Sequence, residues 1–217
     1  MNQPSSLRIS EIFHSLQGES STVGLPTVFV RLTGCPLRCQ YCDTEYAFSG
    51  GTQIDLPDIA DTVAKHNCNF VTVTGGEPLA QPECQLLLNL LCDQGYKVSL
   101  ETSGALPIEL VDQRVSIVLD LKTPGSNECQ KNREENIGFL KKTDQVKFVI
   151  CDRTDYEWSK AKTQQFDLPS RVDEILFSPS YEQLSPNQLA DWILQDQLAV
   201  RMQLQMHKLI WGNEPGR

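Results

Sequence analysis

The stretch "TGCPLRCQYCDT" occupies residues 33–44 and holds Cys35, Cys39 and Cys42 in the spacing C-x3-C-x2-C. It continues directly from "TVFVRLTG" (27–34), whose β-branched and apolar residues predict a strand. Three thiols therefore gather at the carboxyl end of a strand, with no obvious fourth protein ligand nearby. In α/β folds this end of a strand is where ligands bind.

The rest of the chain alternates strands with helices. We expect helices over 56–67, 82–95, 154–165 and 186–198. We expect further strands over 69–78, 96–104, 115–125, 144–150, 173–179 and 199–208. This alternation implies right-handed crossovers and a parallel sheet. The seven strands predict an α/β fold, an incomplete (partial TIM-type) parallel β/α barrel, with residues 1–217 forming a single domain.

Composition narrows the function. The formal net charge of −9 argues against a broad nucleic-acid or anionic-membrane surface. No apolar run approaches the roughly 20 residues that span a bilayer, and the first residues lack the pattern of a secretory signal. We therefore expect a cytoplasmic protein. In that compartment most cysteines are metal ligands or buried thiols, and we expect the five outside the cluster to be structural: Cys68, Cys84, Cys92, Cys129 and Cys151.

Polar residues recur where the predicted strands end, which suggests a single active-site mouth. They are Thr33, Gly34, residues 74–77, residues 101–104, Asp120, Lys122, residues 178–180, Gln205 and His207. On the last predicted strand, period two places Val200, Met202, Leu204 and Met206 on one face, and Arg201, Gln203, Gln205 and His207 on the other. This pattern fits a site-lining strand and a half-exposed strand with a solvent face equally well.

Three kinds of metal site compete for the cysteines. A structural zinc site wants a fourth Cys or His at short spacing, and the chain's three histidines, His14, His66 and His207, lie elsewhere. A catalytic zinc with three thiolates would be a poor Lewis acid. A four-iron four-sulfur (4Fe-4S) cluster held by three thiolates leaves one iron open to a substrate or cofactor. The spacing favours the cluster over zinc.

The motif "CPLRCQYC" (35–42), with an aromatic residue before the last cysteine, resembles the radical S-adenosylmethionine (SAM) enzymes, and so does "TGGEP" (74–78) after a strand. That resemblance implies a partial parallel barrel. It also implies that SAM chelates the open iron and is cleaved to a 5′-deoxyadenosyl radical. The cofactor would carry the difficult chemistry and the protein would position it.

A narrower resemblance covers nearly the whole chain, and its motifs are "IFHSLQGES" (12–20), "VFVRLTGCPLRCQYCDTEYAF" (28–48), "ETSG" (101–104), "LDLKTPGS" (119–126) and "QMHKLIWG" (205–212). Together these resemble the 7-carboxy-7-deazaguanine synthases of queuosine biosynthesis. The resemblance implies a lyase that converts 6-carboxy-5,6,7,8-tetrahydropterin to 7-carboxy-7-deazaguanine and releases ammonia. It further implies catalytic use of SAM, Mg²⁺, an electron donor such as flavodoxin or ferredoxin, and a homodimer.

The same resemblance assigns roles toward the substrate and the metal. Cys35, Cys39 and Cys42 would hold the cluster, and Thr44 would bind Mg²⁺, which prefers hard oxygen ligands. Arg31 could fork onto the substrate carboxylate, and Glu19 could accept N–H donors from the guanidine-like edge. The full set expected to bind the pterin is Leu16, Gln17, Gly18, Glu19, Arg31, Thr74, Gln205 and His207.

The residues expected to contact SAM come from five segments. They are Tyr41, Cys42 and Asp43; Gly76 and Glu77; Glu101 and Ser103; Asp120, Leu121 and Lys122; and Ser178, Pro179, Ser180 and Tyr181. The last segment, "SPSY", departs from the Gln-Pro pairing often found in the family. Two rivals remain at this point: a glycyl-radical activase, which shares the cysteine motif, and a non-catalytic zinc or redox module.

Overall fold

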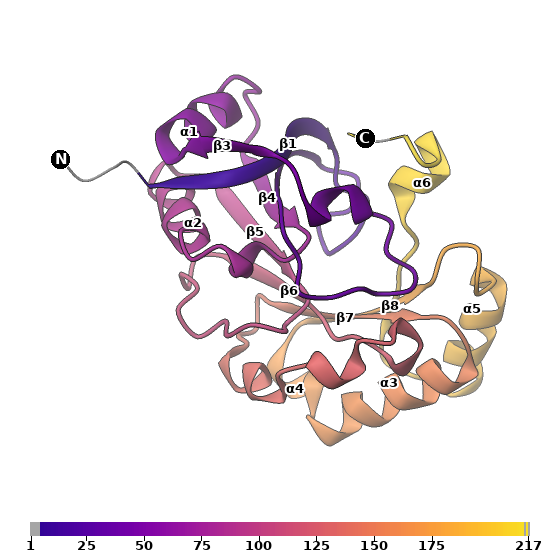
Figure 1. The fold of residues 1–217 in the computed structure, drawn as a ribbon. Helices are drawn as coiled ribbons and strands as arrows, with labels where there is room; N and C mark the ends of the chain where they lie inside the picture. Colours follow the sequence, from indigo (N-terminus) through magenta and orange to yellow (C-terminus); the bar gives the residue numbers. More distant parts are fainter. Residues whose placement is uncertain (1–4, 215, 217) are drawn as a thin grey trace.

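The computed structural model describes residues 5–214 and 216, which form one nine-stranded sheet with helices packed against it (Figure 1). The strand order is β3-β1-β2-β4-β5-β6-β7-β8-β9. The strands are β1 (Ser6–Leu16), β2 (Pro26–Leu32), β3 (Thr52–Asp55), β4 (Phe70–Gly75), β5 (Lys97–Thr102), β6 (Ser116–Asp120), β7 (Gln145–Ile150), β8 (Glu174–Pro179) and β9 (Arg201–Met202). The α-helices are α1 (Leu56–Ala64), α2 (Cys84–Asp93), α3 (Arg153–Gln165), α4 (Leu168–Arg171), α5 (Pro186–Gln195) and α6 (Met206–Trp211).

Seven strands, β2 and β4 to β9, pair in parallel, which confirms the α/β class and the open, incomplete barrel. Each of them lies within a segment where a strand was expected. The sheet is longer than expected because β1 and β3 add two antiparallel strands at one edge. In β1 the pairing register shifts between Ile9 and Glu11. This irregularity breaks the two-residue alternation that would mark the strand in the sequence.

The strand expected over residues 199–208 is wrong for most of its length. Only Arg201–Met202 pair with β8, and α6 begins at Met206. The alternation of faces ends at Gln203, which is 4% exposed. Its side chain accepts from the Ser20 amide at 2.7 Å and donates to the Ser20 carbonyl at 2.9 Å. These bonds turn Gln203 inward and tie the C-terminal segment to the loop after β1.

The core lies between the sheet and the helices that cover it. Figure 1 shows α1 and α2 beside the early strands, and α3 to α5 beside β7 and β8. Helix α2 buries Leu87, Leu88 and Leu91 completely. At the other end, the Phe148 and Phe177 rings of β7 and β8 meet edge to face at 5.4 Å. No helix among the described residues is long and apolar enough to cross a bilayer.

Asp155, in the first turn of α3, holds the carboxyl ends of β6 and β7 in place. Its carboxylate accepts from Thr123 Oγ1 at 3.0 Å, from the Gly125 amide at 2.7 Å and from the Cys151 amide at 3.0 Å. A Cβ on Gly125 would lie 2.4 Å from Asp155 Oδ2, so only glycine allows this approach. Asp155 is 1% exposed, and the buried donors that it accepts from would be costly to leave unpaired.

We expect Asp155→Asn to lower the free energy of unfolding by about 3 kcal/mol, because an amide nitrogen would face buried donors. Urea denaturation of the full chain measures this change. Asp173→Asn is the matched control: the carboxyl is exposed and lies 4.0 Å from Lys142, so the loss there should stay within about 0.5 kcal/mol. Equal midpoints for the two variants would contradict the role given to Asp155.

Candidate active site

The carboxyl ends of the parallel strands surround a cleft of about 840 Å³. Its walls come from the loop after β2 and from the ends of β4, β5 and β6, with Lys147 of β7 at the bottom. The sequence-predicted residues that line it are Glu19, Cys35, Cys39, Tyr41, Cys42, Thr44, Thr74, Gly76, Glu101, Ser103, Asp120 and Lys122. The structure therefore brings most of the predicted site residues to one place.

The three clustered cysteines are free thiols, half-buried in the wall of this cleft. Burial raises the pKa of all three, that of Cys39 to about 11. Within the described part of the chain, no three His, Cys, Asp or Glu side chains converge on the position of a single metal ion. A four-iron cluster does not need such convergence, because each thiolate binds a different iron.

The glycine-rich turn after β4 packs tightly against the cysteine loop. A Cβ on Gly76 would lie 2.4 Å from the Gly34 carbonyl oxygen and 2.7 Å from Cys35 Cβ. The Glu77 amide donates to the same Gly34 carbonyl at 2.8 Å. A side chain at position 76 would thus push the turn away from the cysteines, so glycine keeps this part of the cleft wall closely packed.

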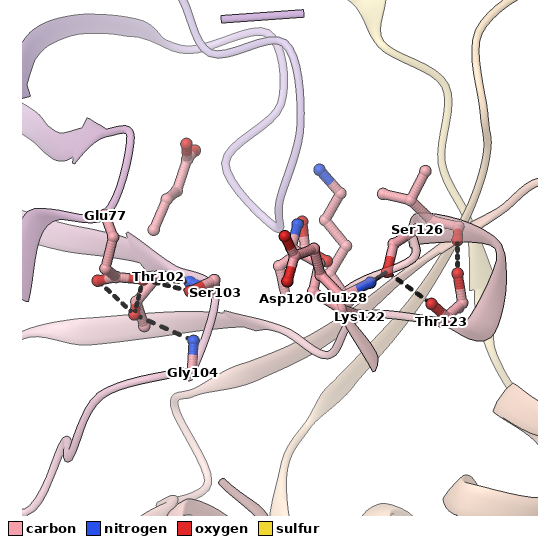
Figure 2. A network of polar contacts seen from close by, with 12 residues as sticks. Glu77, Thr102, Ser103, Gly104, Asp120, Lys122, Thr123, Ser126 and Glu128 are labelled. Carbon is pink, nitrogen blue, oxygen red and sulfur yellow. Dashed lines mark hydrogen bonds and ion pairs between the residues drawn. The ribbon is translucent and has the colours of Figure 1, made fainter. Parts of the chain in front are cut away.

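Glu77 was expected to contact SAM, and the structure corrects this for its side chain. The carboxylate is fully buried and accepts from Thr102 Oγ1 at 2.8 Å, from the Ser103 amide at 2.8 Å and from the Leu79 amide at 3.1 Å (Figure 2). The Ser103 hydroxyl also donates to it, at 2.5 Å. Glu77 therefore ties the turn after β4 to the end of β5 and orients Ser103 at the cleft wall.

Asp120 and Lys122 lie on the cleft wall at the end of β6. Lys122 Nζ donates to Asp120 Oδ2 at 2.9 Å and lies 5.8 Å from the centre of the Tyr41 ring. Burial opposes the charge on Lys122, but Asp120 outweighs it and raises the pKa of the amine. Asp120 Oδ1 is buried and has no partner among the described residues, so it can accept from a ligand hydroxyl. Leu121 between them is 2% exposed and does not line the cleft, which corrects its side chain's expected contact with SAM.

A smaller recess of about 500 Å³ opens beside the cleft. Glu19, Thr44, Thr74 and Glu101 line both spaces, so the two lie next to each other. Of the eight residues expected to bind the pterin, seven line the recess: Leu16, Gln17, Gly18, Glu19, Arg31, Thr74 and His207. The aromatic rings of Phe13 and Phe29, which sequence reasoning missed, complete its wall and stack at 4.9 Å.

Glu101 stands in the wall between cleft and recess. It accepts from Thr74 Oγ1 at 2.9 Å and from Gln17 Nε2 at 3.3 Å. Burial, together with the nearby Glu19 carboxylate, raises the pKa of Glu101. Its position makes it as much a recess residue as a SAM contact.

Lys147 is the main functional candidate that sequence reasoning missed. Its ammonium forms an ion pair with the Glu19 carboxylate, and each side chain is 14% exposed. Burial opposes the charge, but Glu19 raises the pKa of Lys147 above its ordinary value. Gln205 Nε2 adds a bond to Glu19 at 2.9 Å, which is how this residue takes part without lining the recess. The available signal was a lysine in the middle of the otherwise apolar strand "QVKFVI".

Thr44 lies where cleft, recess and outer rim meet. Its hydroxyl donates to Asp43 Oδ1 at 2.9 Å. Asp43 in turn pairs with Lys208 of α6 at 2.9 Å and accepts from Gln205 at 3.2 Å. Burial acts against ionisation, yet Lys208 holds the pKa of Asp43 well below its usual range. Asp43 does not line the cleft. Its side chain pairs with α6 instead, and its direct contact with SAM stays a prediction.

The segment from Ser178 to Tyr181 is not brought into the cleft. Pro179, Ser180 and Tyr181 line a separate pocket between the β8–α5 loop and α6. Ser178 and Ser180 are each 2% exposed, and the Ser180 amide donates to the Ile150 carbonyl at 2.8 Å. Tyr181 reaches the rim beside Tyr41 and Thr44. Ser178, Pro179 and Ser180 therefore do not line the cleft, and their contacts with SAM stay a prediction.

Comparison with known proteins identifies the family. Residues 29–138 match the Radical SAM superfamily. The 7-carboxy-7-deazaguanine synthase of Koribacter versatilis is 43% identical over 222 residues, covering 96% of this chain and 98% of that protein. The synthase of Chlorobaculum tepidum is 43% identical over 215 residues, covering 98% and 97%.

The chain belongs to the 7-carboxy-7-deazaguanine synthase family. It is a radical SAM enzyme of this type. Among solved structures, QueE from Escherichia coli has the same fold, with a TM-score of 0.73 at 21% identity over 93% of this chain and 95% of that one. Membership of the radical SAM superfamily implies a 4Fe-4S cluster and SAM. The three thiols in the cleft wall fit the cluster. The Gly76 backbone beside them and the unpaired Asp120 oxygen fit SAM.

The ion pair between Lys147 and Glu19 is nearly buried, so removing one partner should be costly. We expect Lys147→Met to cost about 3 kcal/mol of unfolding free energy at neutral pH, since it leaves a buried carboxylate beside Glu101. Urea denaturation at pH 7.5 measures this change.

Two further variants control this prediction. Adding Glu19→Gln to Lys147→Met should restore much of the loss, because it removes the unpaired charge. Lys142→Met deletes a 58% exposed lysine from a 4.0 Å contact and should change stability by less than about 0.5 kcal/mol. A loss in Lys147→Met that the added Glu19→Gln change does not relieve would contradict the pairing.

Proposed function

We propose that this synthase converts 6-carboxy-5,6,7,8-tetrahydropterin to 7-carboxy-7-deazaguanine with release of ammonia. The observation that carries the proposal is that the two spaces are adjacent. A recess with carboxylate, amide and guanidinium groups lies beside a thiol-lined cleft and shares Glu19, Thr44, Thr74 and Glu101 with it. A flat, amide-rich bicycle in the recess would present its reacting carbon to the cofactor side. The names of the relatives support the same reaction.

In this proposal the cleft holds the two cofactors. Cys35, Cys39 and Cys42 would bind the cluster, and Gly76 would offer its backbone to the SAM amino group. Asp120 Oδ1 would accept from a ribose hydroxyl, while Lys122 keeps that carboxylate ionised and in place. When bound, the cluster and SAM would supply the reversible hydrogen-atom transfer chemistry that the reaction needs, with SAM used catalytically. The protein's part is to orient the partners and to exclude water.

The recess would recognise the pterin by its edges. Glu19, held by Lys147 and Gln205, can accept two N–H donors from the guanidine-like edge. Arg31 would bind the substrate carboxylate; Glu11 at 2.7 Å from its Nε fixes the guanidinium against the recess. Burial lowers the pKa of His207, so its ring faces the recess neutral at pH 7 and can both donate and accept.

We also propose that Thr44 contributes a ligand to Mg²⁺, with the substrate carboxylate as another. Thr44 touches both spaces, so a metal there would reach a carboxylate in the recess. Magnesium binds hard oxygens and keeps several waters, which suits one hydroxyl and substrate oxygens. The cation would hold the carboxylate and offset negative charge during rearrangement.

The reaction is tested with anaerobically reconstituted protein, dithionite, SAM, Mg²⁺ and the carboxypterin. We expect the deazaguanine product and ammonia in equal amounts, with many product molecules formed for each SAM consumed. Mass spectrometry follows the product and the fate of SAM. If protein with an intact cluster cleaves SAM but leaves the pterin unchanged, the proposed substrate is wrong.

For the metal, we expect Thr44→Ala to raise the Mg²⁺ concentration that gives half-maximal activity by roughly tenfold, about 1.4 kcal/mol for one oxygen ligand. The visible spectrum of the cluster should be unchanged. The control is Thr143→Ala, which alters an exposed threonine just before the start of β7. A Thr44→Ala enzyme with the parent's Mg²⁺ dependence would remove Thr44 from the metal site.

The remaining partners follow from the chemistry proposed. The cluster needs a low-potential one-electron donor, and a flavodoxin or ferredoxin in the cytoplasm would serve. A homodimer is proposed from the family resemblance. Reduction of the cluster by a purified flavodoxin, and the mass of the protein in solution, test these two points.

A further inference from the structure

A single buried carboxylate holds the backbone of the cysteine loop. Glu128 comes from the turn after β6, 90 residues along the chain from Arg38. Its side chain is 8% exposed, and its Oε1 accepts from the Arg38 amide at 2.5 Å. Arg38 immediately precedes Cys39, so this bond fixes the backbone next to a proposed cluster ligand. A carboxylate that accepts from a backbone amide makes one of the stronger hydrogen bonds in proteins.

Lys131 completes the grip on the loop from the same turn. Its ammonium lies 2.9 Å from Glu128 Oε2 and donates to the Pro36 carbonyl at 2.7 Å. The pair thus contacts Pro36 and Arg38, two of the three residues between Cys35 and Cys39. Both contacts go to main-chain atoms, and none goes to a thiol.

Gln40 adds a second attachment on the other side of Cys39. Its amide donates to the Ser126 carbonyl at 3.2 Å, and its side chain donates to the Gly125 carbonyl. The turn that receives these bonds is itself braced. The Ser126 hydroxyl donates to the Thr123 carbonyl at 2.6 Å and accepts from the Glu128 amide at 3.0 Å (Figure 2). Attachment points 36 and 38 therefore lie between Cys35 and Cys39, and point 40 lies between Cys39 and Cys42.

The cysteine loop needs support from the turn after β6 because residues 33–44 contain no helix or strand. Fixing the backbone of each irregular residue costs about 1–2 kcal/mol of conformational entropy. With only three protein thiolates, less of this cost is met by metal binding than in a four-cysteine site. A rigid turn that holds the loop before the cluster forms would lower the cost at that step.

We propose that Glu128, braced by Lys131, is a positioning residue that holds the cysteine loop in its cluster-binding shape and so determines how firmly the cluster is retained. The inference rests on the cluster implied by superfamily membership and not on the pterin reaction. Failure of the pterin assay and failure of this proposal are therefore separate results.

The test compares Glu128→Ala, Glu128→Gln and the parent, all reconstituted as full chains. Glu157→Gln is the control, since it breaks an ion pair on the exposed face of α3. The first readout is the anaerobic rate of iron release to a chelator. The second is the electron paramagnetic resonance spectrum of the reduced cluster with and without SAM. The third is amide hydrogen exchange of residues 37–40 in the cluster-free protein.

We expect Glu128→Ala to release iron roughly tenfold faster, the effect of losing one charge-assisted backbone bond. Its cluster spectrum should broaden or shift, and exchange at residues 37–40 should rise while the core strands stay protected. Glu128→Gln keeps an acceptor for Arg38 but loses the attraction for Lys131, so it should fall between the parent and the alanine variant.

Two results would overturn the proposal. One is iron release and spectra in Glu128→Ala that match those of Glu157→Gln. The other is exchange that rises equally throughout the chain in Glu128→Ala, which would show a general loss of stability instead of a loosened loop.

Discussion

Parallel pairing of β2 and β4 to β9 is the constraint on which the site depends. Parallel strands present their carboxyl ends along one edge of the sheet, and each loop that leaves this edge delivers polar groups to the same mouth. The cysteine loop leaves from β2, the glycine-rich turn from β4, Ser103 from β5 and the Asp120–Lys122 pair from β6. The antiparallel strands β1 and β3 extend the sheet at one edge, and β1 also supplies Phe13 and Leu16 to the recess, which the loop after it closes.

The carboxylates around this mouth have two different roles. Glu77, Glu128 and Asp155 are nearly inaccessible, and each accepts from backbone amides of neighbouring loops. They make the rim rigid. Glu19, Glu101 and Asp120 instead face the cleft, each held by side-chain partners. Groups held in this way keep their orientation when a ligand arrives, which is the physical basis of preorganised binding.

Several residues singled out from the sequence have positions or partners in the structure that differ from those expected. Glu77 was grouped with the SAM contacts because it follows two glycines, whereas its carboxylate is used to join β4 to β5. Residues 199–208 alternate as a strand would, whereas Gln203 is turned inward by the loop after β1. Lys147 carried a visible signal, a charge in an apolar strand. Its partner Glu19 is 128 residues away, however, and no local pattern predicts that contact.

The sequence by itself determined the class of sheet, the seven parallel strands and the family, because hydrophobic periodicity and short motifs are local properties of the chain. It also determined which residue types reach the mouth, since strand ends and polar residues coincide along the chain. Only the tertiary structure decided which carboxylates brace loops and which face a ligand. That distinction depends on burial and on hydrogen-bond donors from distant segments, as the 90-residue separation of Arg38 and Glu128 shows. Such donors are brought together by chain folding and leave no trace in local pattern.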